Sequence, residues 1–117
     1  MQTLKQRRDF LKVSASSFKY IAPGFILQAL PHRGSPSRFG LTASKKVGGA
    51  VDRNFAKRRI RVLVQRYLRS QPLSETYYVI VARPAILKLK FADLEADFQK
   101  ALQFIEKRVK KSDSTEE

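Results

Sequence analysis

The chain has 117 residues, of which 43% are hydrophobic, and its 24 Lys and Arg against 10 Asp and Glu give a formal net charge of +14. That length fits one domain with a modest core, and the apolar content excludes a disordered basic tail. With no cysteine, the sequence offers neither a disulfide framework nor a thiolate site. It contains no apolar run of transmembrane length and no signal-peptide pattern. These features predict a cytoplasmic domain that binds a polyanion, because phosphates would relieve its self-repulsion.

The first part of the chain predicts one helix and two strands. Residues 3–15 mix apolar and basic residues at helical spacing, and two serines end this helix. Strict alternation predicts a strand over residues 25–30. A second strand is expected over residues 38–44, after a turn at residues 32–36.

The last part predicts one strand and one long helix. Residues 76–82 form a continuous apolar run, which is typical of a strand buried on both faces. Residues 91–109 predict an amphipathic helix, and the polar residues 111–117 are expected to fray, which leaves residues 1–110 as a single domain. Since the basic segment between the strands also predicts a helix, the order of elements indicates an α+β fold with a split βαβ element.

The segment 44–69 holds nine of the 24 basic residues and one acid, Asp52, so its net charge is +8. At 100° per residue, its apolar side chains gather on one helix face, the predicted core face. This face consists of Ala56, Ile60, Leu63, Val64 and Tyr67. An adjacent arc, here called the basic ridge, consists of Arg53, Asn54, Lys57, Arg58 and Arg61. The same angles place Arg59 and Arg66 toward solvent.

The basic ridge favours phosphate binding over an ordinary solvated face. Arg53, Lys57 and Arg61 repel one another at i, i+4 spacing, which is destabilising without a counter-anion. Gly48 and Gly49 precede the ridge, where they allow close backbone approach, and the helix N-terminus offers free N–H groups to a phosphate. The segment therefore predicts nucleic-acid binding.

Residues 44–61 read Ser-Lys-Lys-Val-Gly-Gly-Ala-Val-Asp-Arg-Asn-Phe-Ala-Lys-Arg-Arg-Ile-Arg. This run resembles the signature of the bacterial ribonuclease P protein component, in which Ser-Lys-Lys precedes Val-Gly-x-Ala-Val-x-Arg-Asn-x-x-Lys-Arg-x-x-Arg. The resemblance extends over nearly the whole chain. In this sequence Phe55 replaces an arginine of the family pattern, and Ser14 and Gln28 stand where many members have aromatic residues.

The resemblance implies a two-layer α/β sandwich, like a ribosomal-protein domain, with the basic helix in a left-handed βαβ crossover. Such a crossover departs from the strong right-handed rule. It also implies the protein subunit of the ribonuclease P ribonucleoprotein, which binds the catalytic RNA and the 5′ leader of precursor tRNA and promotes endonucleolytic 5′ maturation. Hydrolysis would then fall to the RNA and its Mg²⁺, with no cofactor bound by the protein, no membrane and no evident protein partner.

Two groups of site residues follow from the family pattern. The residues expected to bind the catalytic RNA are Lys45, Lys46, Gly48, Gly49, Arg53, Asn54, Lys57, Arg58 and Arg61. Those expected to contact the leader are Phe10, Ser14, Ile26 and Gln28. Phe10 also fits ordinary core packing, and Phe55 fits either the core or an RNA-facing surface.

No catalytic residue or metal site is predicted in the polypeptide itself. His32 is the only histidine, and its Gly/Pro/Ser turn predicts a solvated side chain. The acids at 93–97 fit the start and the solvent face of a helix better than a metal site. Two alternative functions stay open: a ribosome- or tRNA-associated RNA-binding module without a role in cleavage, and, more weakly, a double-stranded DNA binder lacking a helix-turn-helix.

Overall fold

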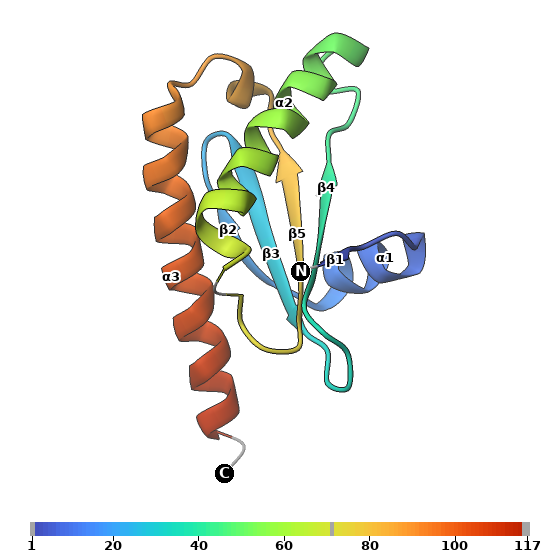
Figure 1. The fold of residues 1–117 in the computed structure, drawn as a ribbon, viewed down its shortest axis with the longest axis vertical. Helices are drawn as coiled ribbons and strands as arrows, with labels where there is room; N and C mark the ends of the chain where they lie inside the picture. Colours follow the sequence, from blue (N-terminus) through green and yellow to red (C-terminus); the bar gives the residue numbers. More distant parts are fainter. Residues whose placement is uncertain (1, 71, 116–117) are drawn as a thin grey trace.

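The computed structural model describes residues 2–70 and 72–115. In this part of the chain, a five-stranded sheet has the order β1-β4-β5-β3-β2. Its strands are β1 (Gln2–Thr3), β2 (Phe18–Ile21), β3 (Phe25–Pro31), β4 (Arg38–Thr42) and β5 (Thr76–Ala82). The helices are α1 (Arg7–Ser16), α2 (Ala50–Leu63), the π-helix η1 (Val64–Leu68), the 3₁₀ helix η2 (Pro84–Leu87) and α3 (Phe91–Thr115) (Figure 1).

Strand β5 lies at the centre of the sheet, between β3 and β4. It pairs antiparallel with β3 and parallel with β4, so that Val79 stands beside Gln28 on one side and Gly40 on the other. Both faces of β5 are covered, since Ile80 belongs to one apolar cluster and Val79 to another. The predicted strand over residues 76–82 and its burial are confirmed.

The two faces of the sheet carry different helices. Helices α2 and α3 cover one face, where Leu27 and Ile80 from the sheet share the main core with Ile60 and Phe98 from the helices (Figure 1). Helix α1 crosses the other face, and its Val13 belongs to a smaller cluster. The predicted α/β sandwich is confirmed, with α1 as a partial cover on its second face.

Helix α2 connects two parallel neighbours, β4 and β5. In Figure 1 both strands run upward, β5 lies to the left of β4, and α2 passes in front of them, which makes the crossover left-handed. The expectation that this βαβ element is split was wrong, because β4 pairs directly with β5.

The N-terminal helix begins later than predicted because the chain first forms β1. Gln2 pairs with Arg38 and Thr3 with Phe39 in parallel register, and the Leu4 N–H donates to the Phe39 carbonyl at 2.7 Å. The chain is therefore extended up to the N-cap of α1 at Gln6. Strand β2 was missed, and β4 is two residues shorter than the predicted 38–44.

Two helix ends also differ from the predicted boundaries. Helix α3 continues to Thr115, so residues 111–115 of the predicted frayed tail are helical, and residues 116–117 lie outside the described part. The basic helix widens into η1, which changes the angle of every later side chain. As a result Leu68 is fully buried, whereas Tyr67, predicted for the core face, is only half-buried.

Leu63 lies on the core face of α2 and is 0% exposed. Its replacement should show how much the packing of this face against the sheet contributes to the free energy of unfolding. We expect Leu63→Ala to lower the free energy of unfolding by about 2–5 kcal/mol, because it leaves a cavity. Val51→Ala on the same helix is the matched control, since Val51 is 83% exposed and its loss should cost under about 0.5 kcal/mol. Urea denaturation measures both, and equal effects would contradict the packing described here.

Candidate nucleic-acid interface

The cations of α2 and η1 do not form one uniform surface. The guanidinium of Arg59 lies 5.2 Å from the ring centroid of Phe55 and 5.7 Å from that of Phe91, and its Nη1 donates to the Ile86 carbonyl at 2.5 Å. The prediction that Arg59 faces solvent was wrong. This side chain is half-buried and ties α2 to η2 and α3.

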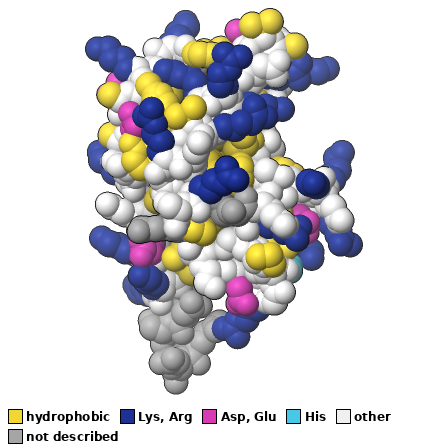
Figure 2. Space-filling model, viewed as in Figure 1, with side chains coloured by type: hydrophobic (Ala, Val, Ile, Leu, Met, Phe, Trp, Pro, Cys, Tyr) yellow, Lys and Arg dark blue, Asp and Glu magenta, His cyan; other side chains and the backbone are white. Residues whose placement is uncertain are grey.

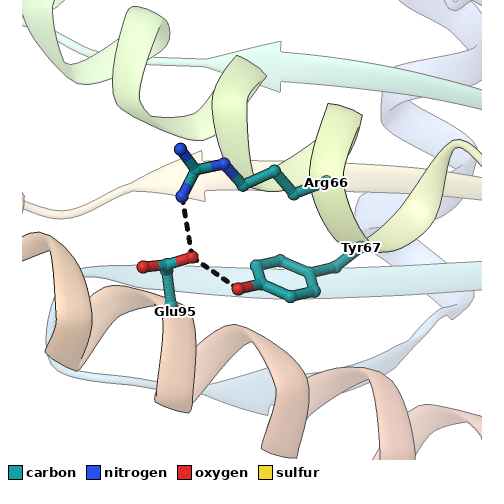
Figure 3. Close-up of polar contacts among 3 residues, drawn as sticks. All are labelled: Arg66, Tyr67 and Glu95. Carbon is teal, nitrogen blue, oxygen red and sulfur yellow. Dashed lines mark hydrogen bonds and ion pairs between the residues drawn. The ribbon is translucent and has the colours of Figure 1, made fainter.

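Arg66 is exposed, and its side chain also contacts α3. Its Nη1 lies 2.9 Å from Glu95 Oε2, and the Tyr67 hydroxyl donates to the same oxygen (Figure 3). The hydrogen bonds from Tyr67 and then Arg66 lower the pKa of the Glu95 carboxyl, and the bond to Glu95 raises the pKa of Tyr67. Arg66 also lies over the Phe91 ring, at 5.4 Å from its centroid. Arg66 nevertheless keeps 56% of its side-chain surface accessible, so the prediction that it faces solvent is confirmed.

On the other flank of α2, two hollows share one lining residue, and the second of them reaches β1 and β4 at one edge of the sheet. The first, of about 240 Å³, is lined by Ala50, Arg53, Asn54 and Lys57. The second, of about 200 Å³, is lined by Thr3, Leu4, Phe10, Phe39, Gly40, Leu41, Lys57 and Arg61. Because Lys57 lines both, we treat these residues together as one edge groove.

The edge groove is strongly basic. The described residues that line it include three cations, Arg53, Lys57 and Arg61, and no Asp or Glu. Lys57 and Arg61 form no ion pair with any described residue. Positive charge without local compensation is expected to attract a polyanion and to gain stability from it.

The loop before α2 presents two further predicted cations. Val47 is buried, and turn hydrogen bonds to the Ser44 and Lys45 carbonyls, at 3.0 and 3.2 Å, fix the loop around it. The side chains of Lys45 and Lys46 are exposed, as are those of Asn54 and Arg58 on the outer surface of α2. Figure 2 shows Lys and Arg side chains gathered over the upper half of the face that carries α2 and α3.

The two glycines before α2 have different surroundings. Gly48 has a φ of +148°, and a Cβ there would overlap the carboxylate of Asp52, so this glycine accommodates an acid in the first turn of the helix. Such an acid is favourable at a helix N-terminus. Gly49 is exposed, and a Cβ there would meet nothing within 4 Å. Of the two, Gly49 leaves open space for a ligand.

The four predicted leader contacts are not equally accessible. Phe10 is half-buried against Gly40, where any Cβ would overlap its ring, and it lines the edge groove with Lys57 and Arg61. Phe10 therefore packs against the sheet and also presents part of its ring to the groove, so it fits both of the roles that the sequence left open.

The other three predicted leader contacts lie on α1 and on β3. Ser14 is exposed and Ile26 is half-buried, so both have surface available for a ligand. Gln28 is only 7% exposed, which leaves it little surface for stacking.

The structure also shows the surroundings of two other ring-bearing side chains, Phe55 and His32. Phe55 is 39% exposed and lies beneath Arg59, so it belongs to the surface of α2 and not to the core. His32 was predicted to be solvated, but it is half-buried and its ring stacks on Tyr77 at 4.4 Å between centroids. A periodicity argument has no means of finding this pair, because the two rings come from distant segments.

Residues 2–70 and 72–115 offer no metal site and no membrane-spanning helix. No group of three or more His, Cys, Asp or Glu side chains there is placed to hold a metal ion. No helix in the same residues has the length and apolar character needed to cross a membrane.

Comparisons with known proteins agree on one family. The family model described as Ribonuclease P matches residues 1–106. The ribonuclease P protein component of Gluconacetobacter diazotrophicus is 41% identical over 101 residues, covering 86% of this chain and 87% of the relative. That of Paramagnetospirillum magneticum is 39% identical over 108 residues, covering 88% and 81%. These matches confirm the resemblance found in residues 44–61.

Solved structures of the same kind share the fold. The RNase P protein of Staphylococcus aureus superposes with a TM-score of 0.76 at 20% identity, covering 89% of this chain and 94% of that one. The protein from Thermotoga maritima superposes with a TM-score of 0.72 at 21% identity, covering 92% and 97%. At these identities the likeness concerns the fold alone.

The contact of Glu95 with Tyr67 and Arg66 should make the attachment of α2 to α3 sensitive to acid. Because the pKa of Glu95 is lowered from 4.5 in the folded state, its stabilisation is present above that value and is lost as the pH falls through the folded pKa. We expect Glu95→Gln to lower the thermal midpoint near pH 7 but not near pH 2. Glu106→Gln, which breaks a more exposed pair with Lys110, should change it little at either pH.

Proposed function

Because the chain belongs to the ribonuclease P protein family, we propose that it docks on the catalytic RNA through α2 and the preceding loop. It then holds the 5′ leader of precursor tRNA beside Phe10. The ribonucleoprotein of this family matures the 5′ ends of tRNA. The observation that carries this proposal is the edge groove. It places the ring of Phe10 in one hollow with Lys57 and Arg61, without any acid among the described residues that line it.

The chemistry of the groove suits RNA whose sequence varies. Lys57 and Arg61 neutralise phosphates, which positions a strand without reading its bases. The Phe10 ring offers an apolar face on which any base can stack, and such stacking is tolerant of sequence. A protein that serves many precursor tRNAs needs this combination, since their leaders differ.

In this proposal the polypeptide contributes binding and charge, and the RNA subunit carries the hydrolysis. Mg²⁺ held by the RNA would activate the attacking water and stabilise the leaving oxygen. The protein's cations lower the repulsion between two RNAs and so reduce the Mg²⁺ that their association requires. The complex would work in the cytoplasm. A ribosome- or tRNA-associated module without a role in cleavage is not favoured, because the matched relatives are ribonuclease P protein components.

Cleavage of precursor tRNA by the catalytic RNA at low Mg²⁺, with and without the protein, tests the proposed function. We expect the protein to restore activity where the RNA alone is inactive, because it supplies counter-charge. No gain from a folded sample, together with equal affinity for ribosomal RNA, would instead support the alternative module.

Removing two of the three groove cations tests the assignment of the groove. Lys57→Ala with Arg61→Ala should weaken RNA binding and reduce the slope of log affinity against log salt by roughly 0.7–0.9 for each lost phosphate contact. The control pairs Lys88→Ala with Lys100→Ala, two exposed cations outside the groove, so that both variants have the same net charge. If the two variants gave equal slopes, only net charge would matter and the groove assignment would be wrong.

A further inference from the structure

A third hollow continues the edge groove at the N-terminal end of the chain. It has a volume of about 450 Å³ and is lined by Gln2, Thr3, Lys5 and Arg38. Thr3 also lines the hollow that contains Phe10, so the two are neighbours along the same edge of the sheet. The described lining again includes two cations and no acid.

Strand β1 builds this hollow. Its parallel pairing sets Gln2 beside Arg38, and the buried Leu4, which is hydrogen-bonded to Phe39, anchors the chain just before Lys5. Lys5 and Arg38 therefore line the same hollow, although the two residues are far apart in the sequence. Although β1 has only two residues, its pairing with β4 brings the two cations to one hollow.

The guanidinium of Arg38 has an unmet hydrogen-bond donor. Its Nε is buried and has no hydrogen-bond partner among the described residues. A buried donor without a partner costs free energy, and the planar guanidinium of arginine pairs well with a charged oxygen acceptor such as a phosphate. The exposed Lys5 adds a second charge at the same hollow.

We infer that Lys5 and Arg38 form a phosphate-binding subsite for single-stranded RNA, at the opposite end of the edge groove from Arg53. The inference rests on the proposed function and extends its binding path. Along this path an aromatic ring, Phe10, lies between cations on either side, an arrangement typical of sites that hold a single strand through its backbone and its bases. The phosphate belongs to the leader or to an unpaired segment of the catalytic RNA.

Precursor tRNAs with leaders of different lengths test the subsite in the complete ribonucleoprotein. The variants are Lys5→Ala, Arg38→Gln and both together, assayed with leaders of about two and about ten nucleotides. We expect the double variant to lose roughly fivefold or more in affinity for the long leader and to lower the salt slope by about 0.7 per cation. The short leader should bind unchanged. Lys88→Ala with Lys100→Ala is again the control of equal net charge.

The possible outcomes separate the sources of the phosphate. A loss confined to the long leader assigns the subsite to the leader. An equal loss for both leaders, with weaker binding of the catalytic RNA, assigns it to that RNA. Unchanged binding for every variant, in a ribonucleoprotein that the wild-type protein does activate, would overturn the inference and leave the proposed function intact. Lys5 is exposed, so Lys5→Ala gives this answer even if Arg38→Gln disturbs the fold.

Discussion

The structure depends on how α2 is held against the sheet and against α3. A helix with Arg53, Lys57 and Arg61 at i, i+4 spacing is destabilised by its own charge. Its core face opposes this repulsion, since Ile60 and Leu63 are fully buried beneath it. The tertiary packing therefore maintains a row of cations that an isolated helix would not hold in place.

Two acids lie against the basic helix at places outside the edge groove. Asp52 lies at the first turn of α2, against Gly48. Glu95 projects from α3 and takes up Arg66 on the opposite flank. The edge groove is left without an acid in its described lining, so its three cations are not neutralised by a neighbouring carboxylate there.

The sheet edge adds an apolar element to this charged surface. Gly40 lacks a side chain, which lets the Phe10 ring lie against β4 and reach the hollow beneath Lys57 and Arg61. An aromatic ring and two cations thus meet where α1, β4 and α2 converge. A ribonuclease P protein acts on many precursor tRNAs, and neither kind of contact depends on a particular base.

The sequence by itself determined the family, the central strand, the final helix and the core face of α2, because each is recorded in a periodic pattern or a long motif. Only the tertiary structure decided the environment of each flank. Helical angles place Arg59 and Arg66 away from the core, but they carry no information that η2 and α3 pack there, where the Ile86 carbonyl accepts from Arg59 and Glu95 pairs with Arg66. Strand β1 likewise has too few residues for any periodicity, and its partner lies more than thirty residues further along the chain. Contacts of this kind depend on which segments meet in space, and that is settled only when the whole chain packs.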